Sequence, residues 1–330
     1  MDRKAFIRRS ALASAGMTLG AGALGSAGAT PDSSGAGGIG LSDVSGATRS
    51  GYGSDEPLTI PAVDTNVTIG SFPFRTFKYD GTAAIARKLK AHHIGEAWTG
   101  SFESLFHKNI DAVNRSLAQE CNTHGDGLLI PFGTVNPAFP DWEEDLRRCA
   151  EVYGMPGIRL YPGYHGYTLT DESFGRFIRQ AIDWDLLVQI AIGVVDPRME
   201  HPLVESEAVN PLPLIDLLKR EETARIQLLF PFYHVRTDRL EQMVRKTEVM
   251  FDISNLDATG SLRMALDGDH IYAPGLKIPA GRLVMGSHMP WFPLENVLFK
   301  FMESPLSSDE AGAILAGNAH RLMKRDIATF

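Results

Sequence analysis

Cysteine is scarce in this sequence: only two of the 330 residues, Cys121 and Cys149, carry a thiol. Both fall in helix-like segments, and their spacing matches no zinc motif. Two buried free thiols are the simpler interpretation. A single disulfide between them stays open, because the sequence does not show whether their Cβ atoms meet. Nothing in the sequence therefore indicates a zinc site built on cysteine.

Basic clusters and long apolar runs are missing as well. The net charge is −8, and beyond the N-terminal segment no Lys/Arg cluster indicates nucleic-acid binding and no basic amphipathic stretch indicates a membrane-binding helix. The Ala/Gly-rich run that ends near Gly25 is too short and too rich in glycine to span a bilayer permanently. We therefore expect a small-molecule substrate, no nucleic acid and no stable membrane span; the oligomeric state stays unknown.

The N-terminal segment has the pattern of an export signal. The pair Arg8-Arg9 precedes the weakly apolar run, and Ser26-Ala27-Gly28-Ala29 supplies a small-x-small cleavage site. These features predict a twin-arginine signal peptide over residues 1–29, which makes the twin-arginine export machinery a partner and places the mature protein in the periplasm or outside the cell. An ordinary N-terminal tail with a chance arginine pair is the alternative.

Large apolar side chains are almost absent from residues 30–57, which are rich in Gly, Ser, Asp and Ala. Such a segment cannot bury enough surface to offset its ordering entropy, so we expect a disordered linker. Residues 58–330 are then one folded domain, a length typical of a single α/β barrel.

Eight short apolar runs alternate with helix-like stretches across that domain. The alternation predicts a parallel sheet closed into a (β/α)8 TIM barrel, whose chemistry would lie at the C-terminal ends of the strands. The predicted strands are residues 59–70, 94–98, 128–135, 157–161, 186–192, 225–230, 249–253 and 282–286. The predicted helices are residues 81–92, 103–124, 140–153, 170–185, 212–222, 238–246, 262–266, 295–302 and 308–325.

Three segments of the chain resemble a known family. They are Val63-Asp-Thr-Asn-Val-Thr-Ile-Gly70, Gly157-Ile-Arg-Leu-Tyr-Pro162, and Gly286-Ser-His-Met-Pro290 with the later Gly317-Asn-Ala-His-Arg-Leu322. They resemble the amidohydrolase-related superfamily (amidohydrolase 2), in the branch of aminocarboxymuconate-semialdehyde decarboxylase-like metal-dependent hydrolases. The resemblance implies a TIM barrel that binds a zinc-like divalent metal. It also implies hydrolysis of C–N, C–O or lactone bonds, or decarboxylation of small acids.

The departures from the family fall on its metal ligands. The family ligates its metal through two histidines on strand one, one each on strands five and six, and an aspartate on strand eight. This sequence has at those places Asn66 and Thr68, Gln189 and Ala191, Gln227-Leu-Leu-Phe230, and His288. Neutral amides and hydroxyls are poor zinc ligands. We therefore expect the usual metal site to be lost, and the cofactor stays unknown.

Polar and aromatic residues still collect at the predicted active end. We expect His288 and His165 to transfer protons, Asp64 and Asn66 to orient the substrate, Arg75 and Arg159 to bind an anion, and Tyr161 and Trp98 to line the site. The candidates for a relocated metal are His201, His234 and His288, with Asp196 a possible substitute for His201. Structural roles stay open, with the arginines paired to Asp64 or Asp252 and the aromatic residues closing the barrel mouth.

The function expected from this pattern is a hydrolase or decarboxylase that acts on a small polar or anionic molecule by acid/base chemistry. A catalytically silent barrel that binds a ligand or a partner protein is the alternative. Whether the chain is an enzyme stays open, because barrels of this type host many unrelated reactions.

Overall fold

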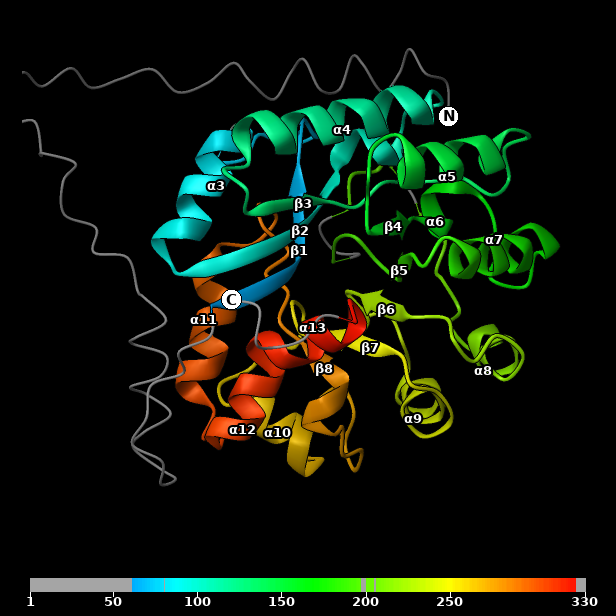
Figure 1. The fold of residues 1–330 in the computed structure, drawn as a ribbon. Coiled ribbons are helices and arrows are strands. Elements are labelled where there is room, and N and C mark those ends of the chain that lie inside the picture. Colours follow the sequence, from blue (N-terminus) through cyan, green and yellow to red (C-terminus); the bar gives the residue numbers. More distant parts are fainter. Residues whose placement is uncertain (1–60, 80, 197–199, 205, 325–330) are drawn as a thin grey trace, which may run out of the picture. The chain divides into compact units, whose positions relative to one another are not determined.

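The computed structural model describes residues 61–79, 81–196, 200–204 and 206–324 (Figure 1). The expected signal peptide (1–29) and linker (30–57) lie outside these residues, so both stay predictions. No helix within the described ranges is long and apolar enough to cross a membrane.

Eight parallel strands form the centre of the fold. They are β1 (Ala62–Ile69), β2 (Ile94–Ser101), β3 (Leu129–Pro131), β4 (Gly157–Leu160), β5 (Leu187–Ala191), β6 (Ile226–Leu229), β7 (Met250–Asp252) and β8 (Leu283–Val284). Strands β1–β3 and β4–β8 pair in sequence order. Parallel bridges from Gly133 to Ile158 and from Val67 to Met289 join the two groups at both seams. The ring is therefore closed, and the predicted (β/α)8 TIM barrel is confirmed.

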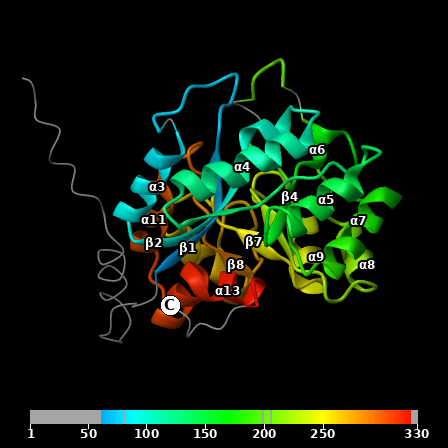
Figure 2. The same cartoon turned by 45° about the horizontal axis from the view of Figure 1, so that its top comes forward.

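The helices surround the strands (Figures 1 and 2). They are α3 (Thr82–Ala91), η1 (Phe102–Leu105), α4 (Ile110–His124), α5 (Trp142–Glu151), α6 (Pro162–His165), α7 (Glu172–Asp183), α8 (Pro213–Leu218), α9 (Thr237–Lys246), α10 (Ser261–Asp267), η3 (Ala280–Arg282), α11 (Leu294–Glu303), α12 (Ser308–Gly312), a π-helical turn η4 (Ala313–Gly317) and α13 (Asn318–Leu322). Helix α7 shows why they pack this way. It buries Phe174, Phe177, Ile178 and Ala181, which share one face of a 3.6-residue helix.

Some predicted boundaries are wrong. The single helix expected over residues 103–124 is two helices, because Asn109 accepts from the backbone N–H of Ala112 at 3.0 Å and starts α4 there. Strand β2 runs past Trp98 to Ser101. Helix α6 was not predicted, although Pro162 at its first turn and Gly166 at its C-cap, with φ of 69°, are the usual boundary residues.

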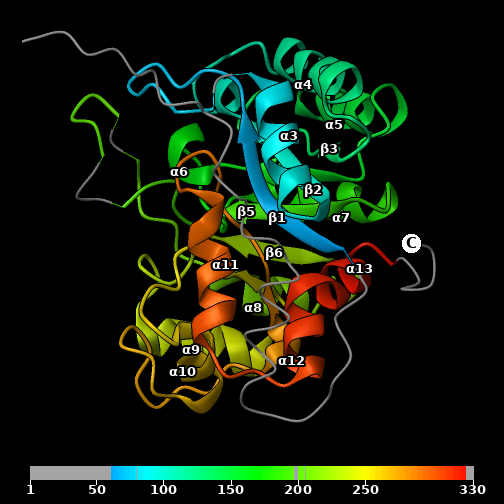
Figure 3. The same ribbon diagram turned by 90° about the vertical axis from the view of Figure 1, so that its left-hand side faces the viewer.

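The last helix closes the N-terminal end of the barrel. In Figure 3, α13 lies beside the start of β1, and Leu322 packs in one apolar cluster with Val63. Asn318 Nδ2 donates to the carbonyl of Leu283 at 2.7 Å, and Arg225 donates to the carbonyl of Leu322 at 2.8 Å. The base of the barrel is therefore apolar and covered, which leaves the opposite end for a ligand.

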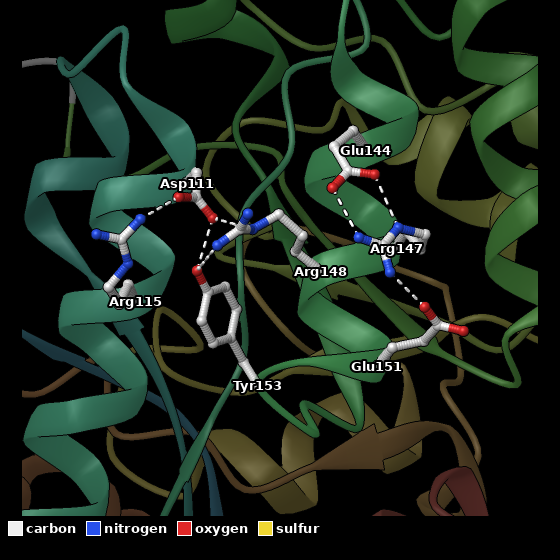
Figure 4. Close-up of polar contacts among 7 residues, drawn as sticks. All are labelled: Asp111, Arg115, Glu144, Arg147, Arg148, Glu151 and Tyr153. Atoms are coloured by element: carbon white, nitrogen blue, oxygen red, sulfur yellow. Dashed lines mark hydrogen bonds and ion pairs between the residues drawn. The ribbon is translucent and has the colours of Figure 1, made fainter.

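Helices α4 and α5 are joined by a polar network on the outside of the barrel (Figure 4). The Tyr153 hydroxyl donates to Asp111 at 2.6 Å, and Arg148 pairs with the same carboxylate at 2.6 Å.

Cys149, on α5, and Cys121, on α4, are buried free thiols. Burial raises the pKa of Cys121 to about 12, so its thiol is unreactive at neutral pH.

Candidate functional site

A hydrogen-bonded network crosses the middle of the barrel, where the family would hold its metal. Gln189 Nε2 donates to the carbonyl of Thr65 at 2.7 Å and to Gln227 Oε1 at 2.8 Å. Gln227 Nε2 donates in turn to the Thr65 hydroxyl at 2.7 Å. These side chains from β1, β5 and β6 meet across the axis, so neutral amides and a hydroxyl fill this layer of the interior.

Arg159, on β4, completes the network and is 1% exposed. Its Nε donates to Gln189 Oε1 at 2.8 Å, and its two terminal nitrogens donate to the carbonyls of Val67 at 2.8 Å and Trp98 at 2.9 Å. The remaining N–H groups face the Thr68 hydroxyl at 3.3 Å and the Thr65 carbonyl at 3.5 Å. A guanidinium has five N–H donors, and here all five are used inside the barrel.

Asp64 is a buried carboxyl at the seam between β1 and the segment after β8. Its Oδ1 accepts from the backbone N–H of Ser287 at 2.9 Å and of Asn66 at 3.1 Å, while Oδ2 has no hydrogen-bond partner among the described residues. Burial raises the pKa of Asp64 to about 6, against the lowering effect of the Ser287 hydrogen bonds. Asp64 therefore keeps its proton to a higher pH than an exposed aspartate does and exchanges it near pH 6.

Asn66 joins a second buried carboxyl to a histidine. Its Nδ2 donates to Asp252 Oδ2 at 2.7 Å and lies 3.2 Å from His288 Nδ1. The other ring nitrogen, His288 Nε2, lies 2.5 Å from the Val194 carbonyl, an acceptor, so Nε2 carries the proton and Nδ1 accepts. Burial lowers the pKa of His288 to about 3. The imidazole is therefore neutral, and both of its nitrogens are engaged.

Two spaces lie at the C-terminal end of the barrel. The interior cavity is about 10 Å³ and is bordered by Asn66, His288 and Trp291 among others, so it has room for one water at most. The mouth pocket is about 310 Å³ and is lined by Phe72, Phe74, Arg75, Tyr164, Val195, Glu200, His201, Pro202, Val204 and Trp291. Trp291 lines both spaces.

Arg75 lines the mouth pocket and has no carboxylate partner among the described residues. Its guanidinium lies 5.7 Å from the ring of Trp291 and 5.3 Å from that of Phe77. No ion pair joins Arg75 to a carboxylate in the part of the chain that the structure describes; Glu200, which lines the same pocket, accepts from the Ser206 hydroxyl at 2.9 Å through Oε1. An anion in this pocket would therefore meet an available guanidinium.

Comparison with known proteins supports the barrel fold. The family model described as Amidohydrolase matches residues 78–235. Over this segment the chain is related to the amidohydrolases. Among solved structures, 2,6-dihydroxybenzoate decarboxylase from Rhizobium is 16% identical, with a TM-score of 0.59 over 80% of this chain and 98% of that one. Dihydroxybenzoic acid decarboxylase from Polaromonas, solved with manganese and 2-nitroresorcinol, is 13% identical, with a TM-score of 0.60 over 82% and 100%.

A third similar structure is 5-carboxyvanillate decarboxylase from Sphingomonas paucimobilis, 13% identical with a TM-score of 0.58 over 81% of this chain and 100% of that one. A search of curated protein sequences found no match. At such identities the solved structures show the barrel fold that this amidohydrolase-related chain shares, and its chemistry has to be argued from its own residues.

The divalent metal of the family does not fit the residues of this amidohydrolase-related barrel. A metal ion needs lone-pair donors, and at the family positions N–H groups already take them: Asn66 Nδ2 faces Asp252 Oδ2 and His288 Nδ1, and the Arg159 guanidinium donates to Gln189 Oε1. No group of three or more His, Cys, Asp and Glu side chains within residues 61–79, 81–196, 200–204 and 206–324 is arranged to hold a metal.

The three histidines expected for a relocated metal do not form one cluster. His201 stacks on Phe74 at the mouth pocket, with ring centroids 4.5 Å apart. His234 and His288 both pack on the ring of Phe230, at 5.5 and 4.9 Å, and His288 Nε2 bonds to the Val194 carbonyl. The geometry therefore does not bring His201, His234 and His288 to one point.

The structure brings some of the other site candidates together and separates the rest. Asn66, His288, Arg159 and Tyr161 border the interior cavity, and Asp64 bonds to the backbone of Asn66. His165 lies apart, with Nε2 at 2.8 Å from the Ser104 carbonyl, and it borders neither the interior cavity nor the mouth pocket.

Two of the expected binding residues have structural surroundings instead. Trp98 lies in the apolar base of the barrel, stacked on Phe132 with centroids 5.1 Å apart, so it is too deep to line a ligand site. Arg159 has no N–H left for an anion, because the strand carbonyls take its donors. Arg75, by contrast, is available at the mouth pocket.

Sequence reasoning missed some members of the site. Thr65 is central to the network, and the register shift of β1 between Asp64 and Val67 hid which side chains point inward. Lys300, on α11, is 6% exposed and donates to the carbonyls of Ile253 at 2.9 Å and Ser254 at 2.6 Å. No sequence pattern indicated that this lysine would be buried beneath the end of β7.

Proposed function

We propose that this amidohydrolase-related barrel binds a small aromatic carboxylate in its mouth pocket. One observation carries the proposal: the Arg75 guanidinium stands at this pocket over the Trp291 ring, without a carboxylate partner in the described part of the chain. A guanidinium binds a carboxylate through parallel N–H donors, and more strongly where aromatic walls exclude water.

The remaining walls suit a planar ring. Phe72, Phe74, Tyr164 and Trp291 contribute aromatic surface, and a volume of about 310 Å³ lies within the range of small-molecule sites. Ligands of this class are also named for the similar structures, one of which was solved with 2,6-dihydroxybenzoate. The ligands named for the similar structures guide the choice of probe. The carboxylate site proposed for this chain depends on Arg75.

Calorimetry with benzoate, 2,6-dihydroxybenzoate and the neutral analogue benzamide tests the proposal. We expect saturable binding of a carboxylate, binding of benzamide that is at least about tenfold weaker, and a comparable loss in Arg75→Gln. Arg236→Gln is the matched control, because Arg236 is an exposed arginine that pairs with Asp238 and does not line the pocket. Equal binding of benzamide and benzoate, or an unchanged Arg75→Gln, would refute the proposal.

A metal-free hydrolase or decarboxylase is the second candidate, favoured by the position of Trp291. Because Trp291 borders both the mouth pocket and the interior cavity, rotation of its indole would join them and let a ligand reach His288 and Asn66. Turnover of aromatic esters, amides or carboxylates in the presence of EDTA, lost in His288→Ala, would support it. Turnover that needs added metal, or that survives in His288→Ala, would exclude it. Saturable binding without turnover of any compound leaves a binding barrel.

Export is part of the proposal. Arg8-Arg9 and the small-residue site that ends at Ala29 support passage through the twin-arginine machinery, which carries folded proteins. A barrel that folds without a metal would need no metal loading before export.

A further inference from the structure

A second and larger space lies beside the barrel mouth. This side cavity is about 380 Å³ and is formed by the end of β1, the loop after it, the end of β2 and one face of α4. It shares Phe72 and Arg75 with the mouth pocket and is otherwise separate. Its wall is rich in hydroxyl groups, from Ser71, Thr76, Tyr79, Thr82, Ser101 and Ser116.

Two carboxylates face the side cavity with acceptor capacity to spare. Glu103 accepts from the backbone N–H of Ser71 at 3.0 Å and from the Ser101 hydroxyl, and Glu120 accepts from the Thr82 hydroxyl at 2.7 Å. A carboxylate offers about four lone-pair sites, so each keeps free acceptors. Neither pairs with a Lys, Arg or His within the described ranges.

The Glu103 carboxylate is held in place by its surroundings. A Cβ at Gly70 would lie 2.1 Å from Glu103 Oε2, so only glycine leaves room for that oxygen, and its φ of +86° also favours glycine. The acceptor side of the cavity is therefore preformed.

The same cavity also contains free donors. Arg75 lines it, and the side-chain contacts of Arg75 within the described residues are with the rings of Phe77 and Trp291. Its guanidinium carries N–H groups and no acceptor. Free donors and free acceptors therefore face one space.

This combination selects among ligand classes. An ammonium ion only donates and would leave the donors of Arg75 without an acceptor, and a carboxylate only accepts and would be repelled by Glu103 and Glu120. A hydroxyl group both donates and accepts and is neutral. We propose that the side cavity is a second binding site, for a small neutral polyol such as a monosaccharide or a cyclitol.

Saturation-transfer NMR and calorimetry on the full chain, with D-glucose, D-galactose and myo-inositol as probes, test this site. We expect saturable binding of at least one probe and binding about tenfold weaker in Glu120→Gln, because an amide has fewer and weaker acceptors. The variant should fold, since glutamine can still accept from Thr82. Glu172→Gln, at an exposed glutamate on α7, is the matched control and should bind as the unmodified chain does.

A second variant fills the space instead of changing its charge. Ser116 is exposed on α4 and lines the side cavity, so Ser116→Phe should abolish polyol binding while benzoate binding at the mouth pocket persists. Absence of saturable binding for all three probes would overturn the proposal. So would binding that both variants leave unchanged, or a preference for methylamine or acetate over the polyols.

Discussion

Asn66 Nδ2 donates to Asp252 Oδ2 at 2.7 Å, so an amide of β1 is bonded to the carboxylate that ends β7. Removal of the amide in Asn66→Ala would take one hydrogen bond from Asp252, which keeps those from Ser254 and Phe230, and would leave the buried Nδ1 of His288 without its contact to Asn66. Because buried polar groups without partners are costly, we expect a loss of about 1–3 kcal/mol in the free energy of unfolding. Urea denaturation measures it, with Asn122→Ala, at an exposed asparagine of α4, as the control. A change no larger than that of the control would contradict the network.

Asp64 makes stability depend on pH in a definite direction. Burial raises its pKa from 3.8 to about 6, so the folded state retains a proton that the unfolded state has released between those values. Its stabilising contribution is full below pH 3.8 and is lost as the pH rises through 6, by about 3 kcal/mol in all. Asp64→Asn keeps an oxygen for Ser287 and Asn66 and cannot ionise.

We therefore expect Asp64→Asn to be more stable than the unmodified chain above pH 6, with the difference shrinking toward pH 4. Chemical denaturation at pH 4, 5, 6, 7 and 8 measures this difference. A difference that stays constant over the series would show that Asp64 is ionised in the folded protein at all these pH values.

His288 has the opposite pH dependence. Burial lowers its pKa from 6.5 to about 3, so its stabilising contribution is present above pH 6.5 and is lost as the pH falls through 3. Nitrogen NMR at pH 5 should show a neutral ring protonated on Nε2, as the Val194 and Asn66 contacts require. Titration of this imidazole near pH 6.5, as for free histidine, would mean that the ring is not enclosed as described.

Export depends on the arginine pair if the twin-arginine assignment is right. Arg8→Lys together with Arg9→Lys should prevent export while the barrel still folds, because both positions lie far outside residues 61–324 in the sequence. Cell fractionation with an antibody to the barrel measures the outcome. Unchanged export of the double variant would point to a different route, and retention of both forms in the cytoplasm would argue against a signal peptide.

The fold was accessible from the sequence because its pattern is repeated and local. The continuous apolar run of β5, Leu187–Ala191, is typical of a strand buried on both faces, and the apolar residues of α7 repeat with the helical period. The ends of the strands were harder to predict from the sequence. The β3 run was predicted as residues 128–135, yet regular pairing stops at Pro131, and only an isolated bridge continues it at Gly133.

The candidate site could be predicted only in part, because a sequence shows neither how deeply a side chain is buried nor which way it points. The convergence of Asn66 and His288 followed from the barrel itself, since strand ends meet at one face. The burial of Arg159 could not be predicted, because the same position in the sequence also suits an arginine that binds a ligand. The carbonyls of β1 and β2 that accept its hydrogen bonds come together only in the folded barrel.

Amides and the Arg159 guanidinium fill the place where the family holds a metal. Metal content of the full chain, purified without chelator or affinity-tag metal, tests it most directly, together with thermal unfolding before and after EDTA. We predict zinc, manganese and iron far below one per chain and an unchanged unfolding temperature. One tightly bound metal per chain, lost with stability on chelation, would contradict the account.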